Sequence, residues 1–279
     1  MVTHLTPLAV SGQSVRDQCM LGMLENDRKL RLLADLPNVA REEMALRDAL
    51  SSGRHRDLVP VFPVTDDVKS DMAWLYSERF RDSPAARDIW LRIVGLAGRR
   101  CPFCHISKPK TVEHSFPKSR YPRIAVDPWN MVPACRDCNF ERNTGSGSIS
   151  ISPYFDTWLV SNSWLVARVL DPGRPEDLQF SAVRHPSFTD DQWHALNEFV
   201  DDVDLFDRYV GLAIEAFSEF AVNLREAYRV PTVADATVSL NDRVSSHLLS
   251  FGINRWQTVA YQAWQTAVHS IDWITAGQP

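Results

Sequence analysis

Residues 101–143 read CPFCHISKPKTVEHSFPKSRYPRIAVDPWNMVPACRDCNFERN and contain two Cys-x-x-Cys pairs, Cys101 with Cys104 and Cys135 with Cys138. Each Cys-x-x-Cys turn brings two thiolates to one side of a tight loop, so two such turns can complete a tetrahedron. Four cysteine ligands with no open position are typical of a structural Zn²⁺ site. The sequence therefore predicts that zinc holds this stretch together, with four buried free thiols as the alternative.

Other uses of the cysteines are less favoured. The chain shows no export signal, and in such a chain paired cysteines indicate metal binding rather than disulfides. A redox role is disfavoured because neither pair stands at the start of a βαβ unit. His105 follows Cys104 directly, but four cysteines already fill the coordination shell, so we expect His105 outside it. Cys19 has no partner in the sequence and is expected to be a small buried hydrophobic residue.

The stretch between the cysteine pairs is basic, although the chain as a whole is acidic. The 279 residues carry 30 Lys and Arg against 35 Asp and Glu, a net charge of −5. This negative net charge excludes a protein that binds nucleic acid through a surface that is basic throughout, but it does not exclude a local basic patch. From Arg99 to Arg123, seven basic residues stand against one acid, Glu113. Basic residues interleaved with aromatics suit a phosphate backbone, and an ordinary solvated loop is the alternative.

Turn signals divide the chain into three regions, with the cysteine pairs in the middle one. Residues 1–98 predict a helical N-terminal region, in which residues 54–67 form a proline-containing linker. Helical apolar spacing marks four segments in this region: 14–33, 38–49, 67–80 and 84–98. Residues 99–155 lose this periodicity, and their prolines break any long helix.

Residues 156–279 predict a helical C-terminal region. Thr189 and Gln192 form a capping box ahead of a long helical pattern that breaks near residues 201–204. A helical hairpin is expected across Gly252, from 238–250 and 254–271. Ten acids and two arginines between residues 171 and 207 indicate a solvated face. The alternative is a surface that docks a partner or keeps nucleic acid away.

Residues 99–145 resemble an HNH endonuclease, a member of the ββα-metal (His-Me finger) superfamily. The resemblance is to the type of HNH endonuclease whose fold is held together by four cysteines. The resemblance rests on an ordered set of positions: Glu113-His114 with Pro117, Asn130-Met131, and Cys135-x-x-Cys138-Asn139-x-x-Arg142. The helical flanking regions predict a mostly α chain, and the resemblance implies a small α+β element embedded in it. Val112–His114 and Asn130–Val132 would be the strands of this element, and Asp137–Asn143 its helix.

The resemblance also implies roles for individual residues. His114 would be the general base, because an imidazole can accept a proton near neutral pH. Asn130 would help to orient that ring. Glu113, Asn139 and Asn143 would hold a catalytic Mg²⁺ or Mn²⁺ through oxygen atoms. The family often has Asp where Glu113 stands and His where the two asparagines stand, and neutral amides favour Mg²⁺ over zinc-type catalysis.

The implied function is metal-dependent hydrolysis of DNA, with double-stranded DNA as the expected substrate. Five basic side chains would clamp the DNA backbone: Lys110, Lys118, Arg120, Arg123 and Arg142. A nuclease with a single active site needs either two copies or two successive binding events to cut both strands of a duplex. The sequence therefore leaves a homo-oligomer open as an alternative to a monomer. The competing reading is a catalytically inactive, zinc-stabilised module that binds nucleic acid and recruits a partner.

The flanks of this core resemble, more weakly, HNH nucleases of bacterial anti-phage systems of the Septu and retron types. This second resemblance implies an operon-encoded protein partner, for example an ATPase. No apolar run approaches the roughly 18 residues that span a membrane, and the first residues lack a signal peptide. We therefore expect a cytoplasmic protein without a membrane partner.

Overall fold

The computed structural model describes residues 3–144 and 151–276. Contacts between Cα atoms divide the chain into two compact units, which we call the N-terminal unit (Thr3–Thr157) and the C-terminal unit (from Trp158 onward). The N-terminal unit thus combines the described residues of two regions that the sequence separates, the expected helical region 1–98 and the cysteine-containing region 99–155.

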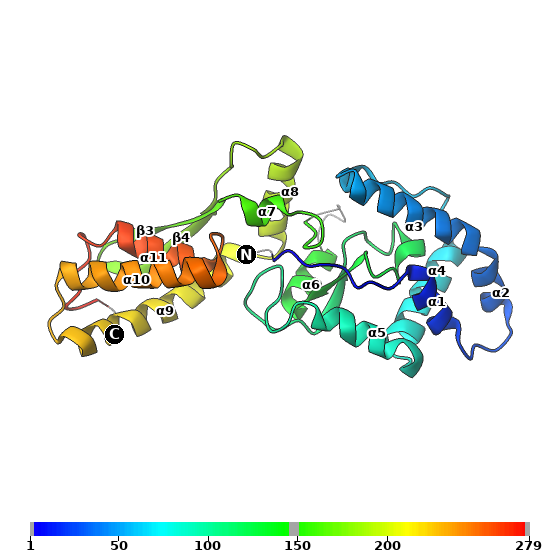
Figure 1. The fold of residues 1–279 in the computed structure, drawn as a ribbon, viewed down its shortest axis with the longest axis horizontal. Coiled ribbons are helices and arrows are strands. Elements are labelled where there is room, and N and C mark those ends of the chain that lie inside the picture. Colours follow the sequence, from blue (N-terminus) through cyan, green and yellow to red (C-terminus); the bar gives the residue numbers. More distant parts are fainter. Residues whose placement is uncertain (1–2, 145–150, 277–279) are drawn as a thin grey trace. The chain divides into compact units, whose positions relative to one another are not determined.

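The first part of the N-terminal unit is helical, as the apolar spacing predicts (Figure 1). Its elements are α1 (Gly12–Met20), α2 (Asp27–Ala34), α3 (Leu36–Ser51), η1 (His55–Asp57), α4 (Asp66–Trp74), η2 (Leu75–Arg81) and α5 (Pro84–Gly95). The expected segment 14–33 is two helices, because Gly22 takes a left-handed φ of +70° and Asn26 caps α2. The π-helical η2 directly continues α4.

A two-stranded antiparallel sheet and a helix follow. They are β1 (Thr111–His114), β2 (Met131–Ala134) and α6 (Arg136–Thr144), with the short η3 (Pro122–Ile124) in the loop between the strands. His114 pairs with Met131 in the ladder. These elements overlap the expected strands and helix and confirm those predictions.

The helices of the N-terminal unit pack directly against this small sheet. One core of buried side chains contains Leu75, Phe80 and Ile93 from the helices together with Val112 and Met131 from the strands. All five are less than 7% exposed. Because burial of apolar surface is the main favourable contribution to folding, this shared core holds η2 and α5 beside β1.

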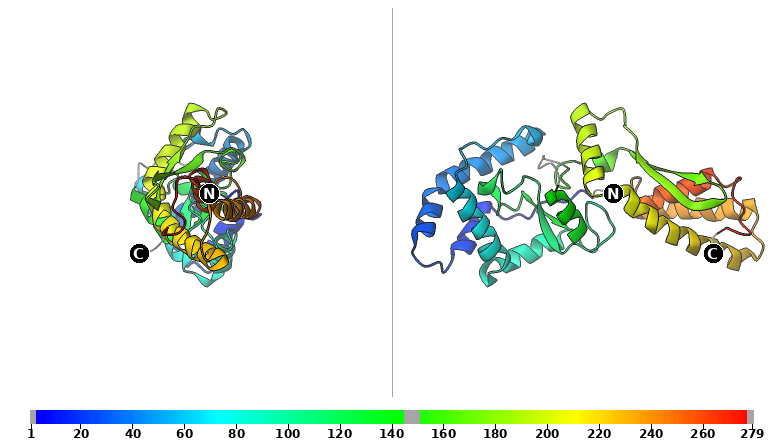
Figure 2. Two further views of the ribbon diagram at one scale, coloured as in Figure 1. Left: turned by 90° about the vertical axis from the view of Figure 1, so that its left-hand side faces the viewer. Right: turned by 180° about the vertical axis from the view of Figure 1, so that it is seen from behind.

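The C-terminal unit is not wholly helical, and in this respect the prediction for 156–279 is wrong. It contains α7 (Trp158–Ser161), α8 (Asp190–Asp202), α9 (Leu205–Tyr228), α10 (Val233–Phe251) and α11 (Trp256–Thr266). An antiparallel pair, β3 (Leu165–Asp171) and β4 (Arg174–Ala182), packs on α11 and α9 (Figure 2, right). Asp171-Pro172-Gly173 is the turn signal that identifies this hairpin.

Three other expectations for this unit are confirmed. Thr189 and Gln192 form the reciprocal capping box at the start of α8. The break between α8 and α9 falls at Asp204, which has a left-handed φ of +47°. α10 and α11 form the helical pair on either side of Gly252. In the described parts of the chain, no helix combines the length and the apolar character that crossing a membrane requires.

Candidate active site and metal centre

The four expected cysteines come together in one buried cluster. Their Sγ atoms all lie within 4.8 Å of one another, and those of Cys104 and Cys135 are 3.8 Å apart. A tetrahedron with Zn–S bonds of about 2.3 Å has S···S edges of about 3.8 Å. Backbone N–H groups also point at the sulfurs, such as that of Ile106 at Cys104 Sγ (3.4 Å). Both the spacing and the donors fit thiolates around Zn²⁺.

The cluster closes the ends of the small sheet. Cys101 and Cys104 precede β1, whereas Cys135 follows β2 and Cys138 lies on α6. The thiolate is the form of cysteine that binds metal. Zinc held here would therefore fix the start of the β1–β2 hairpin to the start of α6.

The two remaining sequence expectations around the cluster agree with the structure. His105 is not part of the four-sulfur cluster, and its Nε2 lies 2.8 Å from the Thr3 hydroxyl. Cys19 lies in the helical core with no exposed surface. Burial raises the pKa of its thiol to about 12, so it is an unreactive hydrophobic side chain.

A cavity of about 330 Å³ lies next to β1, and three of the expected site residues, Glu113, His114 and Asn139, line it. Part of its wall comes from the basic stretch and α6: Lys110, Thr111, Val112, Glu113, His114, Lys118 and Asn139. The rest comes from η2 and α5 and the residues that join them: Tyr76, Arg81, Asp82, Arg87 and Trp90. Two segments far apart in the sequence therefore form one site.

His114 is held in a single orientation in this cavity. Its Nε2 lies 2.8 Å from the backbone oxygen of Ala125, and its ring meets that of Tyr76 edge-on, with centroids 4.8 Å apart. Burial, and then the charge of Lys118, lower the pKa of His114 to about 3. The ring is thus neutral at pH 7, and with Nε2 donating to the carbonyl, Nδ1 is the atom that can accept a proton.

Glu113 and Asn139 are directly in contact. Nδ2 of Asn139 donates to Oε2 of Glu113 at 2.6 Å and to the backbone oxygen of Val112 at 3.1 Å. Burial raises the pKa of Glu113, and the nearby Arg142 opposes that effect. One carboxylate and one amide are a small donor set, but Mg²⁺ commonly takes only one or two carboxylates and completes its octahedron with water and substrate phosphate. The pair therefore fits a hard divalent ion.

Asn130, expected to help orient the His114 ring, makes its hydrogen bonds to the backbone of the loop and not to the ring. Its Oδ1 accepts from the N–H of Phe116 at 2.7 Å, and its Nδ2 donates to the backbone oxygens of Phe116 and Ile124 at 3.1 Å each. The amide therefore ties together the two ends of the loop between β1 and η3 and does not hold the His114 ring itself. Its effect on the ring is indirect, because Ile124 immediately precedes the carbonyl of Ala125.

The basic residues expected to clamp DNA separate into three groups. Lys110 and Lys118 line the cavity, and Lys118 Nζ lies 4.3 Å from the centre of the Tyr76 ring. Arg120 is exposed and lies over the ring of Tyr121. Arg123 and Arg142, by contrast, are buried.

Arg123 is buried in ion pairs, and this corrects its assignment as a DNA contact. Its side chain is 5% exposed, lies 2.8 Å from Asp35 and 3.6 Å from Glu42, and donates to the backbone oxygen of Phe62. A guanidinium enclosed in this way holds α3 to the loop before α4 and is not presented to a ligand.

Arg142 is likewise enclosed. Its Nε lies 3.5 Å from Oε1 of Glu113, its side chain is 5% exposed, and its guanidinium lies over the Phe103 ring. It thus supports the carboxylate of the site and does not face solvent. Asn143, the third expected ligand of the catalytic ion, belongs to α6, but its side chain lies outside the described residues.

Sequence reasoning missed the part of the cavity that comes from the N-terminal helices. Tyr76, Arg87 and Trp90 stand in segments whose apolar spacing indicates only core packing. One sequence signal could have pointed to this part of the cavity wall. Arg81-Asp82-Ser83-Pro84 places two charged residues in the turn directly before the start of α5.

Comparisons with known proteins give partial matches. Protein ea31 of Escherichia phage lambda is 27% identical over 179 residues, which cover 59% of this chain and 60% of that protein. Septu protein PtuB of Bacillus thuringiensis is 32% identical over 76 residues, 25% of this chain and 30% of that protein. No family model and no solved structure matches the chain. The chain is thus similar to a phage protein and to a Septu protein, in each case over less than two thirds of the relative's length.

Proposed function

We propose that this chain is a metal-dependent endonuclease of the HNH type that hydrolyses phosphodiester bonds of DNA. The observation that carries the proposal is the convergence of His114, Glu113 and Asn139 on one cavity, with the imidazole fixed by the Ala125 carbonyl. The antiparallel strands and the helix that present these residues support it, as does the four-cysteine cluster beside them.

In this proposal each side chain of the cavity has a separate role. His114 takes a proton from the attacking water at Nδ1, because the Ala125 carbonyl holds Nε2 and burial keeps the ring neutral. Glu113 and Asn139 would hold Mg²⁺ or Mn²⁺, which supplies charge stabilisation to the phosphate and to the leaving oxygen. Lys118, half-buried next to Glu113, adds positive charge on the same side of the cavity.

The similarity to Septu protein PtuB supports a role in anti-phage defence. In this proposal the nuclease acts with a protein partner encoded beside it, for example an ATPase. The partial coverage of both relatives makes this biological setting a proposal for the whole protein, separate from the chemistry of the cavity.

The decisive experiment compares cleavage of supercoiled plasmid by the wild-type chain and by His114→Ala, each with Mg²⁺ or Mn²⁺. We expect nicking by the wild type and loss of cleavage in the variant, with retained zinc content as the control for folding. Equal cleavage by both proteins would contradict the proposal. DNA binding without cleavage by either protein would favour the inactive binding module instead.

A further inference from the structure

Arg87 is a cation of the catalytic cavity that no sequence motif identifies. It lies on α5, within the helical part of the N-terminal unit, and lines the cavity together with Glu113 and His114. We infer that Arg87 binds a backbone phosphate of the DNA that occupies this cavity, so that the N-terminal helices are part of the substrate site. The inference rests on the proposed function and extends it to a specific contact.

The guanidinium of Arg87 is held in place before any ligand arrives. Its Nη1 donates to the backbone oxygen of Arg81 at 2.9 Å, and its Cζ lies 4.6 Å from the centre of the Trp90 ring. A planar guanidinium stacked on an aromatic ring loses little further freedom on binding, and its fork of donors matches the oxygens of a phosphate. Arg87 is thus preorganised for such a contact.

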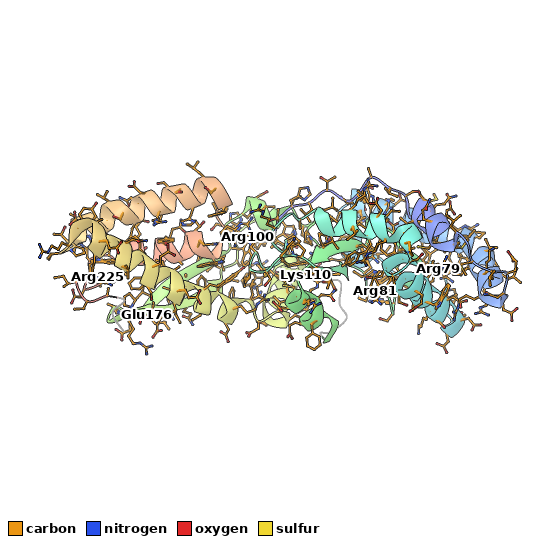
Figure 3. The ribbon with its side chains drawn as sticks, turned by 90° about the horizontal axis from the view of Figure 1, so that it is seen from below. Arg79, Arg81, Arg100, Lys110, Glu176 and Arg225 are labelled. Atoms are coloured by element: carbon orange, nitrogen blue, oxygen red, sulfur yellow. The ribbon has the colours of Figure 1, made fainter. Side chains whose placement is uncertain are left out.

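The neighbouring charges distinguish Arg87 from Arg81. Arg81 pairs with Asp82 through two hydrogen bonds of 3.0 and 2.9 Å, so its charge is largely compensated. Among the described residues, neither Arg87 nor Lys110 makes an ion pair with an acid, although the charge of Arg87 adds to that of Arg81 in lowering the pKa of Asp82. Arg87 and Lys110 both line the cavity. Arg81 and Lys110 are labelled in Figure 3.

The cavity as a whole carries an excess of positive charge. Its wall contains four cationic side chains, Arg81, Arg87, Lys110 and Lys118, and two acids, Asp82 and Glu113. One of the acids is the expected metal ligand, so the site as it works would be more positive still. A polyanionic backbone passing over Glu113 would meet Arg87 from α5 and Lys110 from the segment before β1.

A purely structural role is the competing explanation, because Arg87 also joins α5 to η2 through the Arg81 carbonyl. The two explanations differ in the salt dependence of DNA binding. Each phosphate neutralised by a cation contributes about −0.9 to the slope of log K against log salt concentration. Loss of a structural bond lowers the melting temperature but leaves this slope unchanged.

The test measures binding of a fluorescent DNA duplex by anisotropy at several salt concentrations. All proteins carry His114→Ala, so that the duplex stays intact, and chelators are omitted to keep zinc bound. We expect Arg87→Gln to weaken binding about tenfold at low salt and to reduce the slope by about 1. Arg87→Lys should keep the slope, because it keeps the charge. Arg92→Gln is the control, since Arg92 is exposed on the same helix and is not part of the cavity wall.

An unchanged slope in Arg87→Gln, with or without a lower melting temperature, would overturn the inference. An equal reduction in Arg92→Gln would do the same, because it would show a diffuse charge effect. A change seen with RNA but not with DNA would contradict DNA as the ligand. Cleavage by the His114→Ala background would instead contradict the proposed catalytic function, so the two failures are distinguishable.

Discussion

The Nδ2 atom of Asn139 on α6 donates a 2.6 Å hydrogen bond to Oε2 of Glu113 on β1. The two residues are 26 positions apart, and the contact fixes the direction of a carboxylate that burial would otherwise disfavour in its charged form. An oriented carboxylate binds a cation more tightly than a mobile one, because less freedom is lost on binding.

We therefore predict that Asn139→Ala raises the Mg²⁺ concentration needed for half-maximal cleavage by about 10- to 100-fold. Asn139→His should lose less, because histidine is common at this position in the resembled family. The measurement is a metal titration of plasmid nicking, with zinc content as the control for folding. The same Mg²⁺ requirement in Asn139→Ala and wild type would show that Asn139 takes no part in binding the ion.

The cysteine cluster gives a prediction about folding. Cys138→Ser removes one of four ligands, and zinc binding supplies free energy of folding, on the order of 10 kcal/mol in small zinc domains. We expect the variant to purify with less than one zinc per chain and to melt at a clearly lower temperature. Cys19→Ala is the matched control, because Cys19 is equally buried but outside the cluster. It should keep its zinc. Full zinc content in Cys138→Ser would argue against the predicted site.

The amide of Asn130 gives a prediction that separates support of the loop from direct chemistry. Asn130→Ala leaves the N–H of Phe116 and two backbone oxygens without their partner, and each buried unpaired group costs about 1–3 kcal/mol. We expect destabilisation of about 3 kcal/mol or more, measured by urea unfolding, together with lower cleavage. A variant that loses cleavage at unchanged stability would instead place Asn130 in the reaction itself.

The sequence was sufficient to predict the elements of the core, because several independent signals coincide there. The cysteine pairs bracket the hairpin, the prolines exclude a long helix, and Glu113-His114 and Asn139 fall on elements that place them together. By contrast, the hairpin β3–β4 was missed. Leu165–Asp171 is a short, mainly apolar run that fits either a helix or a strand. Only the turn signal at Pro172-Gly173 distinguishes between these two possibilities.

The cavity wall and the buried arginines were not predictable in the same way. Tyr76 and Trp90 belong to apolar stripes, and helical spacing indicates which face is buried but not which other element covers it. Arg123 looked like a surface cation because composition carries no information on burial. Only the fold shows that Asp35 and Glu42 surround it.

The enclosed position of Arg123 leads to a prediction opposite to that for Arg87. Removing one partner of a buried ion pair leaves an uncompensated charge, at a cost of about 3–5 kcal/mol. Arg123→Gln should therefore unfold at a clearly lower urea concentration, with no change in the salt slope of DNA binding. Arg120→Gln is the comparison, since Arg120 is exposed and should keep its stability. A lower salt slope in Arg123→Gln at unchanged stability would restore it as a DNA contact.

Asp156 gives a prediction about pH. It is fully buried, with Oδ1 2.7 Å from Arg56 and 3.4 Å from His55. Burial alone would raise the pKa of its carboxyl, but the contacts with His55 and Arg56 lower it from 3.8 to about 2. A depressed pKa means that the ionised carboxylate stabilises the fold above pH 4, and that this contribution is lost as the pH falls from about 4 towards 2.

We therefore predict that the stability difference between wild type and Asp156→Asn shrinks by about 1 kcal/mol between pH 6 and pH 3. The measurement is urea unfolding at each pH. Comparing the two proteins at the same pH cancels the loss of zinc in acid, because both keep all four cysteines. The asparagine variant should be the less stable protein at pH 6, since Arg56 then lacks its charged partner. A difference that stays constant over this range would mean that Asp156 does not titrate with a lowered pKa, and that its contacts stabilise the fold independently of its charge.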